Sequence, residues 1–250
     1  MTDHVDFNPV AAAYEKYRVG YGTDVFAAIA KRIDTSEASV VLDLACGTGL
    51  STVPLRKLTS GIVVGADIAG ELMKRAPRVA DGQPMSYITA DANKLPFMDH
   101  SLSAITCGQA MHWMDPDIVM PEVVRTLAPG GWFFAYWKYP APDEPYQLLA
   151  NDVLGDILGR KIESRYTLST MPDLQSYGLN EFAEEKFDLP LPYTVESYVG
   201  FMRSRNRIRK LAGDHTEEFL RRYEVELEKL RPNGQTFEEM NEVYLFSGRK

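Results

Sequence analysis

Cysteine is scarce in this sequence, and long hydrophobic runs are absent from it. The 250 residues include two cysteines, Cys46 and Cys107, and both lie inside apolar stretches. No charged region, hydrophobic stretch and cleavage site follow one another at the N-terminus, so we expect a reducing, cytoplasmic location. The longest apolar tract, residues 130–137, has the length of a strand, which predicts no membrane span.

Basic residues are also fewer than acidic ones, 27 against 35. The formal net charge of −8 opposes the counterion release that drives most nucleic-acid binding, so we predict no nucleic-acid partner. One local excess of cations consists of Arg203, Arg205, Arg207, Arg209 and Lys210. One interpretation is that this cluster faces an anionic substrate. A cluster of this kind more often forms a solvated helix face that pairs with nearby glutamates, and we favour that interpretation.

The composition is that of a globular protein, with 45% hydrophobic and 25% charged residues, and it predicts one folded domain. Apolar stretches of strand length alternate with helical periodicity. The predicted strands are 40–44, 62–66, 85–89, 102–107 and 132–137, and the predicted helices between them are 50–58, 71–76 and 117–127. Strands separated by helices predict a parallel, doubly wound α/β sheet with crossover connections.

The periodicity changes after residue 138, where three prolines interrupt the chain and a helix is predicted at 146–158. Two more helices are predicted at 194–211 and 216–230. We therefore expect a single domain with a seven-stranded, mostly parallel sheet and a helical cap. Its core is predicted at 23–137 with late strands at 182–192 and 242–248, and its cap at 1–22, 138–180 and 194–231.

The most informative segment is VVLDLACGTG, residues 40–49. The strand that contains Asp43 runs into a turn of small residues with Ala45, Gly47 and Gly49, and a helix follows directly. Small residues let a ligand approach the backbone at the carboxyl edge of a parallel sheet, where open α/β sheets bind ligands. This pattern predicts a nucleotide-type pocket.

Two common nucleotide-binding patterns are missing. A dinucleotide site requires G-x-G-x-x-G, but those positions hold Ala45, Gly47 and Leu50, so the third glycine is absent. The G-x-x-x-x-G-K-[ST] pattern that cradles phosphates does not occur either. A ligand without phosphates therefore fits the turn better.

With these features the sequence resembles the class I S-adenosylmethionine-dependent methyltransferases, which have a Rossmann-like fold. The resemblance implies that Asp43 and the turn of Ala45, Gly47 and Gly49 hold the methionine end of S-adenosylmethionine. Many members have a glycine where Ala45 stands. Alanine is still small, so we expect binding to survive, whereas a larger side chain would block the methionine group.

Two acids behind the turn extend the resemblance. Asp67 ends the second strand and matches the family's acid that accepts both ribose hydroxyls, for which a carboxylate has two oxygens. Ile68, the next residue, is assigned to the same cofactor site. Asp91 follows the third strand and matches the acid that accepts the adenine amino group, while the backbone N–H of Ala92 faces a ring nitrogen.

The segment at 125–131 resembles the family's helix, turn and strand that follow the fourth strand, with a structural role. The resemblance therefore covers residues 40–135 in the right order. The N-terminal Tyr14, Tyr17 and Arg18 resemble an arm that closes over the cofactor carboxylate, although tyrosines on a helix can simply pack. We predict no metal site.

The acceptor side is predicted after the fourth strand, beside the transferable methyl group. Gln109, His112 and Trp113 supply an amide, an imidazole and an indole N–H, which can orient a carboxylate. Gln109 is also assigned to the cofactor site. The His-Trp pair resembles small-molecule carboxyl methyltransferases that act on trans-aconitate-like and juvenile hormone acids. This resemblance implies O-methylation of a carboxylic acid, although Arg205 stands where some members have an aromatic residue.

Several alternatives stay open at this point. A carboxylate is ionised at pH 7 and needs no base, whereas a phenol or alcohol does, and His112 is then the best-placed catalytic base. C-methylation or N-methylation of a small molecule is a further alternative. A non-catalytic S-adenosylmethionine-binding scaffold is the alternative from another class, and a nucleic-acid or protein methyltransferase ranks last. The expected product of the cofactor is S-adenosylhomocysteine, and the oligomeric state is left open.

Overall fold

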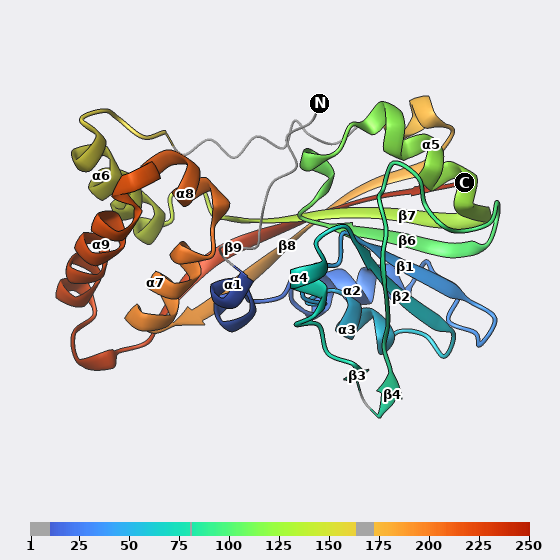
Figure 1. Ribbon diagram of the computed structural model, residues 1–250, viewed down its shortest axis with the longest axis horizontal. Coiled ribbons are helices and arrows are strands. Elements are labelled where there is room, and N and C mark those ends of the chain that lie inside the picture. The colour runs from blue at the N-terminus through green and yellow to red at the C-terminus, as the bar shows by residue number, and fades with distance from the viewer. Residues whose placement is uncertain (1–10, 81, 164–172) are drawn as a thin grey trace.

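The computed structural model describes residues 11–80, 82–163 and 173–250. One lobe is a sheet covered by helices on both faces, and the other is a helical cap (Figure 1). Three long strands run from one lobe into the other, namely β7 (Leu127–Pro140), β8 (Asn180–Tyr193) and β9 (Phe237–Arg249). None of the helices in the described ranges combines the length and the hydropathy needed to cross a bilayer.

The large sheet has seven strands in the order β5-β2-β1-β6-β7-β9-β8. Its remaining members are β1 (Val40–Leu44), β2 (Ile62–Asp67), β5 (Ser86–Thr89) and β6 (Leu102–Gly108). The strands from β5 to β7 are parallel, and β9 lies antiparallel between β7 and β8. A separate antiparallel pair consists of β3 (Val79–Ala80) and β4 (Gln83–Pro84). The predicted doubly wound, mostly parallel sheet is confirmed, and its order reverses between β1 and β6, where such sheets bind ligands.

Helices cover both faces of this sheet. The helices α2 (Thr23–Ala30), α3 (Thr52–Arg56) and α4 (Gly70–Met73) lie on one side, and α5 (Pro116–Thr126) lies on the other (Figure 1). Successive side chains of β7 point to opposite faces of the sheet, because side-chain direction along a strand has a period of two residues. Trp137 is buried in the cluster that contains α5, and Tyr136 is buried in the cluster that contains α2.

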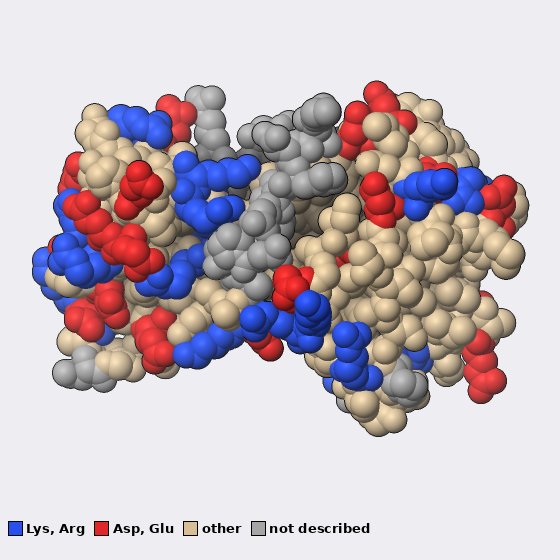
Figure 2. Space-filling view, in the orientation of Figure 1, with Lys and Arg blue, Asp and Glu red and all other residues tan. Residues whose placement is uncertain are grey.

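The cap consists of α6 (Pro145–Leu158), α7 (Val195–Arg203), α8 (Asn206–Ala212) and α9 (Thr216–Leu230), and α1 (Ala11–Tyr17) packs against α7. A capping box starts α7, since Thr194 and Ser197 each bond the other's backbone N–H, at 3.2 and 2.9 Å. The outer side of the cap carries both acidic and basic side chains (Figure 2). Inside, the cap has a hydrophobic core of its own, against which Tyr17 of α1 packs.

The predicted helix at 194–211 is wrong as a single element. The structure divides it into α7 and α8, with Ser204 and Arg205 between them. Arg205 has an extended backbone (φ −88°, ψ 115°), and the Ser204 hydroxyl accepts a hydrogen bond from Arg18 Nε at 2.9 Å. This long-range contact has no signal in the local periodicity. The predicted helix at 50–58 is also shorter, because α3 spans five residues around Pro54.

The predicted cap boundary at 138–180 is wrong at both ends. Residues 138–140 belong to β7, and the segment at 174–179 packs on the core lobe against α5. Leu174 and Leu179 are buried there, and the Tyr177 hydroxyl donates to Asp117 Oδ1 at 2.5 Å. The predicted strands 182–192 and 242–248 are longer in the structure because β8 and β9 pair along their whole length, from Tyr193 with Phe237 to Asn180 with Arg249.

Candidate active site

The turn after β1 adopts the left-handed backbone that its small residues suggest. Ala45, Gly47 and Gly49 have φ angles of 57°, 54° and 81°, a region in which side chains other than glycine are strained. A Cβ atom at Gly49 would lie 2.7 Å from the Tyr87 hydroxyl. The turn thus brings its backbone to the carboxyl edge of the sheet, and Gly49 faces protein and not the ligand cavity.

Asp43 lies beneath this turn and is fully buried. Its carboxylate accepts hydrogen bonds from the hydroxyls of Ser51 at 2.8 Å, Thr52 at 2.6 Å and Thr106 at 3.0 Å. Burial raises the pKa of Asp43 to about 6, and these hydroxyl bonds oppose the shift. The structure therefore places Asp43 as the residue that anchors the turn to α3 and β6, outside the lining of the cavity.

Asp67 at the end of β2 links two neighbouring turns. Its Oδ2 accepts from the Gly47 backbone N–H at 2.8 Å, and its Oδ1 accepts from the Ala69 N–H at 2.7 Å. Each oxygen keeps a second acceptor position, so the carboxylate suits a vicinal diol such as a ribose. Burial raises the pKa of Asp67, and the backbone N–H bonds counteract this effect. The residue is thus oriented before any ligand arrives.

A first cavity of about 410 Å³ opens over these turns. Most of the predicted cofactor residues line it: Tyr14, Ala45, Gly47, Asp67, Ile68, Asp91, Ala92 and Gln109. Trp113, predicted on the acceptor side, lines it as well. The predictions missed Leu72, Asn93, Met114, Asp115 and Ile118, which lie in loops or on helices without a distinctive motif. The size, the ribose-type acid and the small residues of the turn fit S-adenosylmethionine.

Four predicted cofactor residues lie outside this lining. Arg18 lines a second cavity, and Asp43 and Gly49 support the turn from behind. Tyr17 packs in the cap, where a Cβ atom at Gly200 would lie 2.5 Å from its ring. Its hydroxyl donates to Glu196 at 3.4 Å. Tyr17 therefore holds α1 against α7, and Tyr14 is the tyrosine of this arm that reaches the cavity.

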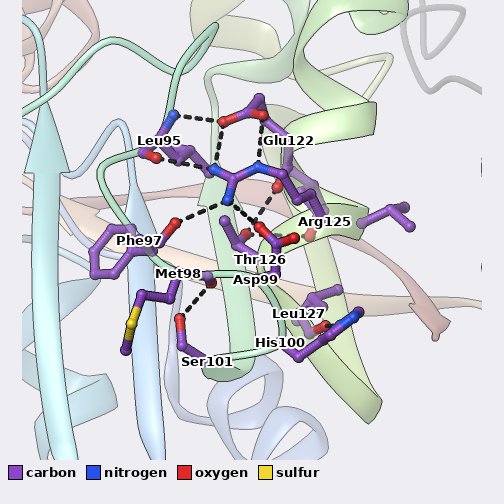
Figure 3. A network of polar contacts seen from close by, with 12 residues as sticks. Leu95, Phe97, Met98, Asp99, His100, Ser101, Glu122, Arg125, Thr126 and Leu127 are labelled. Carbon is purple, nitrogen blue, oxygen red and sulfur yellow. Dashed lines mark hydrogen bonds and ion pairs between the residues drawn. The ribbon is translucent and has the colours of Figure 1, made fainter.

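The loop between β5 and β6, which includes Asp91, is bonded at residues 95–99 by Arg125 of α5 (Figure 3). The Arg125 guanidinium donates to the carbonyls of Leu95 at 3.0 Å and Phe97 at 2.9 Å, and to Asp99 at 2.7 Å. Glu122 accepts from it at 2.8 Å and also accepts from the Leu95 N–H at 2.8 Å. Arg125, the first residue of the segment at 125–131, thus fixes the loop between β5 and β6.

Replacing Arg125 with glutamine should loosen this loop and weaken S-adenosylmethionine binding on the order of tenfold, since small misplacements of positioning groups have large effects. Turnover at saturating cofactor should change little. Isothermal titration of the cofactor measures the change. Arg249→Gln, which removes the exposed pair with Glu181, is the matched control. Unchanged cofactor affinity in the Arg125 variant would contradict the positioning role.

Ala45 offers a second test of the turn. Ala45→Gly should keep cofactor binding and change the free energy of unfolding by no more than about 1 kcal/mol, because the relief of φ strain offsets the added chain entropy. Ala45→Val should lose cofactor binding, since a branched side chain is strained at positive φ and would enter the cavity. Thermal unfolding and cofactor titration of both variants separate strain from occlusion. Equal binding in the two variants would contradict the close approach.

A second cavity of about 820 Å³ adjoins the first and extends between the two lobes. Tyr14, Gln109 and Trp113 line both cavities and therefore mark their junction. Gln109 has a φ of 56°, its backbone N–H donates to Tyr136 O at 2.8 Å, and its Nε2 donates to Lys138 O at 2.6 Å. These bonds hold the Gln109 amide in place at the junction.

Cations dominate the lining of the second cavity. Arg18, Lys138 and Arg205 form its inner cation cluster, and the last two are buried. The Lys138 ammonium donates to the carbonyls of Val19 at 2.6 Å and Gly20 at 3.0 Å. Burial, with Arg18 and Arg205 nearby, lowers the pKa of Lys138 to about 7. The predictions missed Lys138. The sequence feature that could have indicated it is a single cation at the end of an apolar strand.

The prediction that residues 203–210 form only a solvated face is wrong for three members. Arg205, Arg207 and Lys210 line the second cavity. Arg203 does follow the prediction, because it is exposed and its Nη2 donates to Glu217 at 2.9 Å. The break between α7 and α8, which periodicity does not reveal, brings Arg205, Arg207 and Lys210 to the lining of the second cavity.

His112 also lines the second cavity, on the 3-10 turn η2 (Met111–Trp113). The buried Trp137 donates its indole N–H to His112 Nδ1 at 3.2 Å. Since an indole nitrogen can only donate, Nδ1 is the acceptor, and the neutral ring carries its proton on Nε2. The surrounding protein lowers the pKa of His112 to about 4, because desolvation disfavours the imidazolium. His112 therefore presents a neutral N–H donor near pH 7.

Comparison with known proteins agrees with this fold. Residues 42–135 match the family described as "Methyltransferase domain". An uncharacterized methyltransferase of Mycobacterium tuberculosis is 32% identical over 170 residues, which are 68% of this chain and 65% of that protein. The chain thus spans just under two thirds of that relative. The ubiquinone/menaquinone biosynthesis C-methyltransferase of Desulfotalea psychrophila is 38% identical over 96 residues, or 38% of this chain and 39% of that one.

Among solved structures, a protein of Anaeromyxobacter dehalogenans assigned provisionally as a type II methyltransferase has a TM-score of 0.70. It is 16% identical, with 93% of this chain and 98% of that chain covered. The sheet order and this likeness define a Rossmann-like methyltransferase fold. More particularly, the chain carries the methyltransferase domain, at residues 42–135, and S-adenosylmethionine is the cofactor of that domain.

Proposed function

We propose that the protein transfers the methyl group of S-adenosylmethionine to the carboxylate of a small organic acid. The observation that carries the proposal is the charge of the second cavity, whose inner cation cluster lies next to the junction with the first. Cations held together inside a protein repel one another, and an anion among them relieves that repulsion. The cavity is therefore suited to an anionic acceptor.

S-adenosylmethionine supplies a methyl group on a sulfonium, and transfer of that group to a carboxylate oxygen leaves a methyl ester and S-adenosylhomocysteine with no proton to remove. Asp67 and Asp91 would hold the ribose and adenine, and the backbone of the β1 turn would face the methionine end. The protein then has to align the two reactants and exclude water. Tyr14, Gln109 and Trp113 lie at the junction where that alignment takes place.

His112 acts in this proposal as a donor to the acceptor carboxylate. Its Nδ1 lone pair is occupied by the Trp137 N–H, and its Nε2 carries a proton, so no lone pair is left for a base. A carboxylate is ionised at pH 7 and needs none. A phenol or alcohol would need one, so this arrangement favours the carboxylic acid over the hydroxyl alternative.

His112→Gln should raise the KM for the acid about tenfold and leave kcat and the pH profile nearly unchanged, because a glutamine amide also donates. Steady-state kinetics from about pH 6 to 8 measures both effects. A loss of turnover confined to low pH would instead indicate a base and a hydroxyl acceptor. Trp137→Phe is the companion variant, since it removes the donor to Nδ1 and leaves this nitrogen as a possible base, while the burial that lowers the pKa of His112 remains.

The proposal is tested with methyl-labelled S-adenosylmethionine and a panel of carboxylic acids, phenols, alcohols and amines. Label that appears in a base-labile ester supports carboxyl transfer. Label in a base-stable product supports C-methylation or N-methylation. C-methylation is included because the Desulfotalea relative is named a C-methyltransferase. Calorimetric binding of the cofactor without transfer to any member of the panel would favour a non-catalytic scaffold.

A further inference from the structure

A fully buried carboxylate, that of Glu239, lies on β9, which begins in the cap and ends in the core lobe (Figure 1). Phe237, Glu239 and Asn241 share one face of this strand, because side-chain direction has a period of two residues, and all three are buried. Phe237 belongs to the hydrophobic core of the cap, whereas Asn241 lines the second cavity. Along the strand, Glu239 therefore lies between an apolar core and the wall of the cavity.

Side chains of α6, α7 and β9 donate hydrogen bonds to this carboxylate. Its Oε1 accepts from Gln147 Nε2 at 2.7 Å and from the Tyr198 hydroxyl, and its Oε2 accepts from Asn241 Nδ2 at 3.0 Å. Both oxygens are thus hydrogen-bonded, as a buried carboxylate requires. Stability alone is a weak reason for this charge, since apolar residues of similar volume often replace buried ionic groups without loss of stability.

Gln147 extends these contacts to Arg205, which is buried and lines the second cavity. While Gln147 Nε2 donates to Glu239, its Oε1 accepts from Arg205 Nη1 at 2.7 Å. An amide has one donating and one accepting end, and a carboxylate accepts only. Glu239 therefore fixes which end of the Gln147 amide faces the Arg205 guanidinium.

Glu239 also affects the charge of Lys138, which lines the same cavity. Burial lowers the pKa of Lys138 to about 7, Arg18 and Arg205 contribute to this shift, and the negative charge of Glu239 opposes it. The Lys138 ammonium lies 5.9 Å from the centroid of the Tyr21 ring. Without the charge of Glu239, the pKa of Lys138 should fall below 7.

We propose that Glu239 is a positioning residue for acceptor binding, which through Gln147 holds the Arg205 guanidinium at the wall of the second cavity. The inference rests on the proposed function, in which cations of this cavity bind the acceptor carboxylate. Glu239 is not among the described residues that line the cavity, so it acts through Arg205 and not by contact with the acceptor.

Gln147→Leu breaks the link to Arg205 and leaves the charge of Glu239 in place. For the carboxylic acid that is methylated fastest in the panel, KM should rise about tenfold, and kcat should change by less than about twofold. Binding should still weaken above pH 7, since Lys138 keeps its charged neighbours. Steady-state kinetics from about pH 6 to 9 measures these effects. Titration of the acid into the complex with S-adenosylhomocysteine gives its affinity without turnover.

Glu239→Gln gives a result whose sign separates two roles. A buried carboxylate repels an anionic acceptor, so without a positioning role its removal should lower the KM for the acid. If Glu239 positions Arg205, KM should instead rise about tenfold, even at the acidic end of the series where Lys138 is charged. The weakening of binding should also begin below pH 7, because Lys138 loses the charge that raises its pKa. A lower KM in this variant overturns the positioning role.

The double variant Gln147→Glu with Glu239→Gln exchanges the amide and the carboxylate and keeps their hydrogen bonds. The carboxylate at position 147 can accept from Arg205, from Tyr198 and from the amide at position 239, whose oxygen can accept from Asn241. KM should therefore return to within about threefold of the wild-type value, a coupling that two independent substitutions would not show.

Glu242→Gln is the matched control, because Glu242 belongs to the same strand and pairs with the exposed Lys186 at 2.7 Å. It should keep the wild-type KM and pH dependence. Thermal unfolding and cofactor affinity verify the fold of each variant. If folded Gln147→Leu keeps the wild-type KM, the positioning inference fails and the proposed function stands. If the wild-type protein binds the cofactor and methylates no acid, the proposed function is overturned, and this inference with it.

Discussion

Asp67→Asn is expected to weaken S-adenosylmethionine binding about a hundredfold, the loss that corresponds to the charge-assisted bonds a carboxylate can form with two hydroxyls. The wild-type carboxylate also accepts the N–H groups of Gly47 and Ala69, one on each oxygen. An asparagine amide has one oxygen, so its NH₂ group would face one of these donors. The substitution thus removes ligand contacts and disturbs both turns of the cofactor site.

Isothermal titration with S-adenosylmethionine and with S-adenosylhomocysteine measures the effect. Glu71→Gln is the matched control, because Glu71 lies nearby on α4 and forms an exposed pair with Lys74. A thermal unfolding curve for each variant separates loss of binding from loss of fold. If Asp67→Asn binds the cofactor as tightly as the control, Asp67 does not hold the ribose, and the assignment of the first cavity fails.

Acceptor affinity is expected to fall as the pH rises above 7. In the empty cavity the pKa of Lys138 is about 7, lowered by burial and by Arg18 and Arg205. An anion beside Lys138 favours the ammonium, so the pKa rises in the complex and binding takes up a proton above pH 7. Linkage then limits the loss to about tenfold per pH unit, and it ends at the pKa of the complex. Below pH 7 the affinity should be nearly flat, since Lys138 is charged in both states.

The KM for the acid, measured at constant ionic strength from about pH 6 to 9, tests this behaviour. Lys138→Met should bind the acid more weakly at pH 6 and should lose the pH dependence. Lys138 also holds the arm at Val19 and Gly20, so cofactor affinity is measured in parallel to detect a displaced arm. A wild-type KM that is constant across this range, or that falls with rising pH, would remove Lys138 from acceptor binding.

The core of the fold and the cofactor edge were predictable because their signals are local. The apolar run of β7 and the helical periodicity of α5 appear within one element each. The turn at Ala45 and Gly47 follows β1, and Asp67 follows from the end of β2. In a parallel sheet the carboxyl ends of neighbouring strands lie together, so sequence order alone brings these residues to one edge.

The cap boundaries could not be predicted in the same way. The break between α7 and α8 depends on Ser204, whose hydroxyl is bonded by Arg18 from the other end of the chain. The segment at 174–179 has no periodicity that distinguishes packing on the cap from packing on α5. Helical propensity extends across such points, and tertiary contacts override it.

The sequence by itself determined the parallel α/β core and, through its resemblance to a known family, the methyltransferase domain, because a turn and two acids at strand ends are local signals. Only the tertiary structure decided the charge of the second cavity. Arg18, Lys138 and Arg205 belong to three distant segments, and packing brings them together. The same holds for His112, whose neutral ring depends on burial and whose tautomer depends on Trp137 of β7. Charge and tautomer at this site are properties of contacts across the fold, which no local pattern encodes.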